Sequence, residues 1–149
     1  MNRDRLKKYK VTPDYKYFPE NQLELAGIIR QLVDKRGYKV DLNDIDVSKV
    51  DDMSYLFTGL HRLQHFNGDI SKWDVSRVKN MEGMFRSNKK FNGDISDWDV
   101  VNVHNMRFMF ESSKFDGDLS DWNPPTTSDQ TNMFSDCPLE NHPPKWYHK

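Results

Sequence analysis

Hydrophobic and polar positions recur along this chain with a period close to 25 residues. The stretch FNGDISDWDV at 91–100 nearly repeats FNGDISKWDV at 66–75, and a weaker copy, FDGDLSDWN, begins at residue 115. A period of this length is typical of proteins in which short coils stack and each coil buries its apolar face against the next. Four units are visible, and the first and last are the least regular, as units that close an array should be.

The first half of each unit predicts a short strand. Ile70, Trp73 and Val75 have the spacing of the leucine-rich-repeat signature L-x-x-L-x-L. Trp73 and Val75 are two residues apart, so both would face inward from a strand while Asp74 points outward between them. Strands from successive coils would then pair at the usual spacing of about 4.8 Å and form a parallel sheet.

The second half of each unit predicts a short helix followed by a turn. Val78, Met81 and Phe85 lie on one face at helical spacing. Asn67-Gly68 and Asn92-Gly93 are turn dipeptides in which glycine accepts a positive φ. The predicted fold is an α/β repeat solenoid of the leucine-rich-repeat type, with short parallel strands and short helices stacked in about four coils.

One stronger helix precedes the repeats. Asn21 and Glu24 have the spacing of a capping box, and Gly37 is placed to end the helix in the left-handed conformation. Apolar residues recur between them on one face, namely Leu25, Ile28, Ile29, Leu32 and Val33. We predict that this helix is an N-terminal cap that covers the first coil.

Aromatic residues at equivalent positions predict three files through the core. Each aromatic side chain would bury on the order of 150–250 Å². The files are Trp73, Trp98 and Trp122; Phe66, Phe91 and Phe115; and Phe57, Phe85, Phe110 and Phe134.

These elements divide the chain into four parts. We predict a polar N-terminal extension at 1–18, the capping helix at 19–38, the repeat solenoid at 39–136, and a Pro-rich C-terminal cap at 137–149. The excess of basic residues in the extension is interpreted as a solvated tail, because no aromatic or glycine spacing accompanies it. Trp146 is expected to fold back over the last coil.

Composition narrows the functional classes. The net charge of −1 gives no general attraction to nucleic acid, and the aromatic content of 13% argues against disorder. The single Cys137 cannot form an internal disulfide. No segment is apolar enough for membrane insertion, and the N-terminus lacks the apolar run of a secretory signal. As written, the chain is expected in the cytoplasm, whereas a form trimmed of its signal would suit the cell surface.

Several phrases resemble a known family. FNGDISKWDV, DVSRVKNMEGMF, DLNDIDVSKVDDMSYLF and the closing PPKWY look like the BspA-like leucine-rich-repeat surface proteins, which include repeat lipoproteins of Mycoplasma and relatives in gut bacteria. The resemblance covers residues 17–147. It implies a leucine-rich-repeat-like solenoid and a role in binding or adhesion, and it assigns no catalytic residues.

The repeated aspartates are the sharpest polar feature. Asp69, Asp94 and Asp118 form one column, with Asp74 and Asp99 beside it. A calcium site needs several oxygens that converge on each ion, whereas each coil offers only one or two carboxylates. We therefore predict that these aspartates bind nearby backbone N–H groups and shape their turns, with a calcium ladder as the alternative.

Two other pairs suggest chemistry at first sight. His61 and His65 would share one face of a helix, as two zinc ligands do, but no third and fourth ligands are evident. We predict a plain surface or binding-loop role for them. Cys137 and His142 lack the third orienting group that a thiol enzyme needs. No enzymatic activity, cofactor or metal is predicted.

Function is expected at the positions that vary between units, because the repeated positions build the coil. Lys72, Asp97 and Asp121 vary, and Asp74 and Asp99 point outward beside them. Their acidic bias favours a basic partner. We predict a monomeric, non-catalytic protein-interaction module of the binding or adhesion type, with a protein or a glycan as partner. The alternative is a phage or mobile-element factor that binds and modulates a host protein inside the bacterium.

Overall fold

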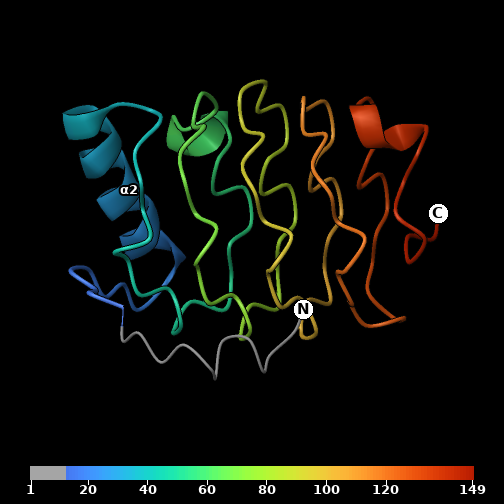
Figure 1. Cartoon of the computed structure of the whole chain (residues 1–149), viewed down its shortest axis with the longest axis horizontal. Helices are drawn as coiled ribbons and strands as arrows, with labels where there is room; N and C mark the ends of the chain where they lie inside the picture. Colours follow the sequence, from blue (N-terminus) through green and yellow to red (C-terminus); the bar gives the residue numbers. More distant parts are fainter. Residues whose placement is uncertain (1–12) are drawn as a thin grey trace.

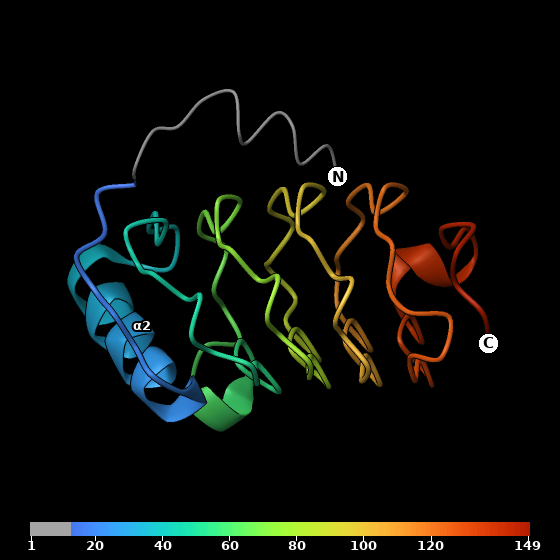
Figure 2. The ribbon, with the colours of Figure 1, turned by 90° about the horizontal axis from the view of Figure 1, so that it is seen from below.

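The computed structural model describes residues 13–149, and Figures 1 and 2 show them as a row of coils with a helix at one end. Within these residues the one α-helix is α2, Gln22–Arg36, and two short 3₁₀ helices follow, η1 at Gly59–His61 and η2 at Pro138–Glu140. None of the described helices is long and apolar enough to cross a membrane. Most of the predicted polar extension, residues 1–12, lies outside the described residues.

The helix α2 is the predicted capping helix. Asn21 accepts a hydrogen bond from the Glu24 N–H at 3.0 Å, while the Glu24 carboxylate accepts from the Glu20 N–H at 2.7 Å. Gly37 has a φ of 87°, which favours glycine, although its ψ of 172° is extended rather than left-handed helical. The buried face of α2 consists of Leu25, Ala26, Ile29, Leu32 and Val33.

The predicted parallel strands do not form. Within residues 13–149, successive coils meet only in isolated parallel bridges, and no sheet is built from them. Four of these bridges join successive coils: Asp41 with Asp69, Asp52 with Asn80, Asn80 with Asn105, and Asn105 with Asp129. The prediction of an α/β repeat solenoid with stacked strands, and with it the leucine-rich-repeat architecture, is therefore wrong.

Hydrogen bonding explains why the return segment of each coil is neither a strand nor the predicted helix. The N–H groups of Met81, Gly83 and Phe85 donate to carbonyls of the next coil at 2.8–2.9 Å. The N–H groups of Met84 and Arg86 instead donate to carbonyls three residues earlier in the same coil, and each of these bonds closes a turn. A residue with positive φ interrupts each segment at equivalent positions, namely Tyr55, Gly83, Phe108 and Asn132.

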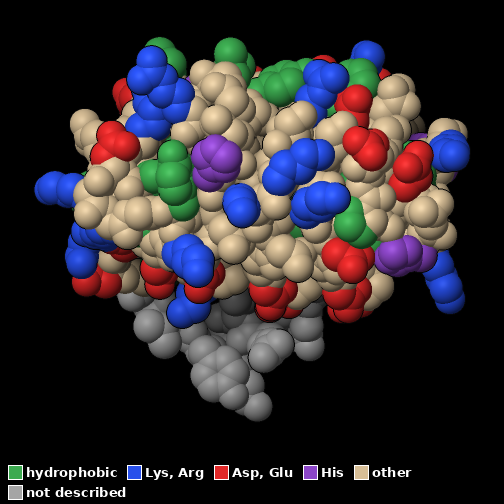
Figure 3. All heavy atoms as spheres, turned by 90° about the horizontal axis from the view of Figure 1, so that it is seen from above, with side chains coloured by type: hydrophobic (Ala, Val, Ile, Leu, Met, Phe, Trp, Pro, Cys, Tyr) green, Lys and Arg blue, Asp and Glu red, His purple; other side chains and the backbone are tan. Residues whose placement is uncertain are grey.

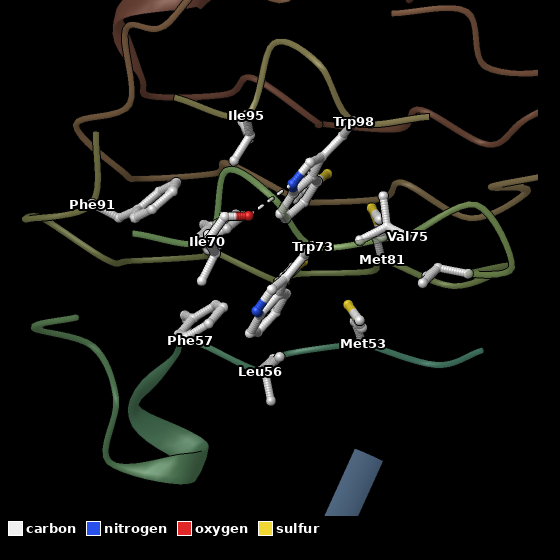
Figure 4. Packing of buried hydrophobic residues seen from close by; sticks show 14 of the residues in the cluster. Met53, Leu56, Phe57, Ile70, Trp73, Val75, Met81, Phe91, Ile95 and Trp98 are labelled. Atoms are coloured by element: carbon white, nitrogen blue, oxygen red, sulfur yellow. Dashed lines mark hydrogen bonds between the residues drawn. The ribbon is translucent and has the colours of Figure 1, made fainter. Parts of the chain in front are cut away.

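In the first half of each coil, tryptophan side chains supply bonds between coils. The Trp98 Nε1–H donates to the Ile70 carbonyl of the preceding coil at 3.1 Å (Figure 4). The same bond joins Trp73 to Leu42, Trp122 to Ile95 and Trp146 to Leu119. The backbone N–H of each repeat tryptophan meanwhile closes a turn on its own coil, as that of Trp98 does on the Ile95 carbonyl at 3.2 Å. The inward tryptophans are thus confirmed, but no strand carries them.

The three predicted aromatic files are present. Neighbouring rings within each file lie nearly parallel, with centroid steps of 6.3–6.4 Å for Trp73, Trp98 and Trp122 and 6.0–6.1 Å for Phe66, Phe91 and Phe115. The file of Phe57, Phe85, Phe110 and Phe134 has steps of 5.3–5.8 Å. Trp146 extends the tryptophan file by one further ring, 6.1 Å from Trp122. These rings form the centre of one continuous core.

Gly68 and Gly93, which follow Phe66 and Phe91 by two residues, are needed for close packing and not for the predicted positive φ. The described glycines with positive φ are Gly37 and Gly83, so Gly68 and Gly93 do not use that conformation. A Cβ at Gly68 would lie 2.0 Å from the Val40 carbonyl oxygen, and one at Gly93 would lie 2.9 Å from the Phe91 ring. Close approach of ring and backbone, rather than turn conformation, excludes a side chain here.

Candidate interaction surfaces

Each aspartate of the predicted column acts inside its own turn. Asp69 Oδ1 accepts from the N–H and the hydroxyl of Ser71 at 2.9 and 2.7 Å. Asp94 makes the same two bonds to Ser96, and Asp118 accepts from the Ser120 N–H at 2.9 Å. These are the predicted turn-shaping bonds. Within residues 13–149 no group of three or more His, Cys, Asp or Glu side chains could hold a metal ion.

The turn bonds also change the acidity of these carboxyls. The Ser96 hydroxyl and then its N–H hold the pKa of Asp94 below its usual value. At Asp69, burial is the largest single effect and raises the pKa. The bonds from Ser71 and Asn43, together with the charge of Lys72, outweigh it and lower the pKa overall. These carboxylates therefore stabilise the folded state in their ionised form.

Three of the five predicted contact residues lie one per coil directly before a buried tryptophan, and the other two directly follow one. Lys72, Asp97 and Asp121 are exposed at equivalent positions. Asp74 is exposed and Asp99 half-buried, and both also bind their own turns: Asp74 Oδ1 accepts from the Ser76 hydroxyl at 2.6 Å, and Asp99 Oδ1 from a backbone N–H at 3.2 Å. We call these five residues the acidic face.

The two loop histidines do not share a helix face. His61 ends η1, and Arg62 follows with a φ of 61°, which turns the chain before His65. Burial, and then the Arg30 charge, lower the pKa of His61. His65 is exposed, and its ring meets that of Tyr38 edge-on at 5.7 Å.

Cys137 and His142 are not paired in the structure. Cys137 is buried, and burial raises the pKa of its thiol. His142 Nε2 instead lies 3.2 Å from Asp116 Oδ1. A thiol kept protonated and away from its base does not have the features of a nucleophile.

Sequence reasoning missed a basic edge formed by the loops between coils. Figure 3 shows lysine and arginine side chains over the middle of the face seen from above, with acidic side chains along its lower margin and towards its right-hand end. The loops 58–65, 86–90 and 111–114 expose six basic side chains. Arg86 pairs with Glu111, and the other five are Arg62, His65, Lys89, Lys90 and Lys114. We call these five residues the loop ridge. A signal was present, since His65, Lys90 and Lys114 each precede a phenylalanine of the second file.

The fold and these surfaces define a stack of short coils closed by one helix, with charged side chains presented from turns. Residues 29–146 match the family described as "Mycoplasma protein of unknown function, DUF285", and because this match spans most of the chain, the chain belongs to that family. No curated protein and no solved structure matches the chain. The family fits the predicted Mycoplasma-type repeat relationship, but it does not confirm a BspA-like leucine-rich-repeat protein.

Proposed function

We propose that this protein is a non-catalytic binding module that holds a protein partner on the acidic face. One observation carries the proposal: the positions that vary between coils, Lys72, Asp97 and Asp121, are exposed at equivalent places in successive coils. Stacked coils of this kind hold such a column rigidly, which reduces the ordering cost of binding.

The column is fixed by the bonds around it. The Lys72 N–H donates to Asn43 Oδ1 of the preceding coil at 2.8 Å, and the neighbouring Trp73 indole is tied to the Leu42 carbonyl at 2.9 Å. Four carboxylates and one ammonium group on this face favour a basic partner surface. The phrases that resemble BspA-like surface proteins also support a binding or adhesion role, although the proposal does not use their repeat architecture.

Affinity capture with matched variants tests the proposal. The tagged protein is used to recover partners from cells of its source, and each recovered protein is then purified and titrated against the module. Asp97→Asn with Asp121→Asn should weaken binding by about tenfold, since two charge interactions are removed. Asp14→Asn with Asp51→Asn changes the net charge equally at exposed sites outside both proposed surfaces and should leave binding within about twofold. Equal affinity for both double variants would refute the assignment of the acidic face.

A further inference from the structure

The loop ridge repeats with the coils. His65, Lys90 and Lys114 directly precede Phe66, Phe91 and Phe115, whose rings stack with steps of 6.1 and 6.0 Å. The three side chains therefore leave equivalent backbone positions, one per coil, with a similar step. Within residues 13–149 neither Lys90 nor Lys114 forms an ion pair, whereas the neighbouring Arg86 is neutralised by Glu111 at 3.3 Å.

A buried polar residue fixes the backbone beneath the ridge. Asn88 is fully buried, and its Oδ1 accepts from the N–H groups of Lys90 and Phe91, both at 2.9 Å. Its Nδ2 donates to the carbonyls of Phe57 and Phe66, both at 3.2 Å, which are the two ends of the longest loop. One satisfied side chain thus ties the 86–90 loop to the 58–65 loop, and this preorganises the cations that the loops carry.

The ridge continues into a hollow beside α2. This hollow, of about 450 Å³, is lined by residues that include Arg30, Asp34, Tyr38 and Arg62. Tyr38 joins it to the ridge, because its ring also contacts that of His65. Two guanidinium groups against one carboxylate leave the hollow suited to an additional carboxylate.

We propose that the loop ridge and this hollow bind an extended acidic segment of another protein, with Asp or Glu at alternate positions. Alternate side chains of an extended chain lie on one side about 6.6 Å apart, close to the 6.0–6.1 Å steps between the phenylalanine rings that follow the ridge residues. Over two steps the mismatch is about 1 Å, which long lysine side chains absorb. This surface is distinct from the acidic face, and its ligand has the opposite charge.

Binding of two defined peptides tests this proposal. Labelled peptides of about ten residues, one with alternating Glu and Thr and one of the same composition with all Glu clustered, are titrated against the protein at low salt by fluorescence anisotropy. The alternating peptide should bind more tightly, because its carboxylates match the coil step. Lys90→Glu with Lys114→Glu should weaken its binding at least tenfold.

The matched control reverses two exposed lysines outside the loops. Lys79→Glu with Lys145→Glu has the same net charge and should change the affinity by less than about twofold. Equal losses for the two double variants, or equal affinity for the two peptides, would overturn the proposal. Tighter binding of a sulfated glycan or a single-stranded oligonucleotide through the same lysines would also overturn it, as would self-association in sedimentation that Lys90→Glu abolishes. None of these results alters the capture test on Asp97 and Asp121, so failure of one proposal is distinguishable from failure of the other.

Discussion

The two ends of the coil stack are closed in different ways. At the N-terminal end, α2 presents a regular apolar face, in which Leu25 and Ile29 are fully buried. At the C-terminal end, an irregular segment continues the stack only through side chains, with Trp146 and Tyr147 half-buried against Trp122 and Phe134. The helix therefore covers the first coil without sharing the conformation of a coil. The tail, in contrast, places single side chains where a further coil would have them.

The two ends of the stack also differ in hydrogen bonding, because a side chain donates at one end and accepts at the other. In the return segments, alternate backbone N–H groups donate toward the C-terminal side, as that of Tyr55 does to the Glu82 carbonyl, so this segment of the first coil presents carbonyls to α2. The Gln22 amide of α2 donates to one of them, that of Ser54. At the other end Glu140 accepts from the Asp136 N–H at 3.1 Å. The direction of bonding along the stack therefore decides that an amide donor suits one end and a carboxylate acceptor the other.

The last coil differs from the inner coils in its interior as well. Ser128 and Gln130 are buried where the preceding coil has Val103 and Met106. The Gln130 amide donates to the Ser128 hydroxyl at 3.1 Å and accepts from the His148 N–H at 3.0 Å. The tail is thus needed to satisfy a polar interior, while α2 covers an apolar one.

The largest effect is expected where the stack is farthest from either end. Trp98→Ala should cost roughly 3–5 kcal/mol, because it removes a ring stacked on both sides and the bond to Ile70. Trp146→Ala should cost less than half of that, since Trp146 is half-buried and stacks on one side only. Urea unfolding measures both, and equal losses would contradict the distinction between the inner coils and the tail.

A second comparison sets the two closures directly against each other. Ile29→Ala should destabilise the protein by about 2–4 kcal/mol, because Ile29 is fully buried on the inner face of α2. Tyr147→Ala at the other end should cost about 1–2 kcal/mol, since its ring is only half-buried against Phe134. Thermal denaturation of the two variants would show the expected order, and the reverse order would mean that the tail is the stronger closure.

The polarity of the ends predicts a smaller effect of about 1 kcal/mol. Gln22→Glu replaces the donor that serves the Ser54 carbonyl with an acceptor, so it should destabilise the protein by about 1–2 kcal/mol. Glu140→Gln keeps an acceptor for the Asp136 N–H and should change stability by less than about 0.5 kcal/mol. Chemical denaturation measures both changes, and equal losses would show that bonding direction does not decide the caps.

Acidification should produce the smallest effect, spread over all coils. The folded-state pKa of Asp94 and of Asp129 is lowered by bonds from Ser96 and Thr131, so their stabilisation is present above about pH 4 and is lost as the pH falls further. Asp94→Asn retains an acceptor for the turn but removes the titration. The variant should therefore lose less stability between pH 5 and pH 3 than the parent, and an unchanged acid profile would refute this assignment.

The sequence predicted local features correctly where a residue type has one structural role. The capping helix followed from Asn21 and Gly37, the aromatic files from their period, and the aspartate turns from the small number of carboxylates in each coil. The predictions of a strand and of a helix in the return segment were wrong. The same apolar spacing also fits turns in which backbone N–H groups donate alternately within a coil and to the next coil. The loop ridge was missed because its residues vary in type, so that their shared position before the second file of phenylalanines did not stand out. The monomeric state and the cytoplasmic location stay predictions.

The sequence by itself determined the period, the inward residues of each coil and the helix that precedes them, because burial of large aromatic rings at a fixed interval leaves little choice of which side faces the core. Only the tertiary structure decided the path of the backbone. Whether Gly83 or Met84 donates within its coil or to the next one depends on a neighbour about 25 residues away, which no local pattern specifies. The same distant contacts placed Trp146 in the tryptophan file and brought Lys90 and Lys114 onto one edge.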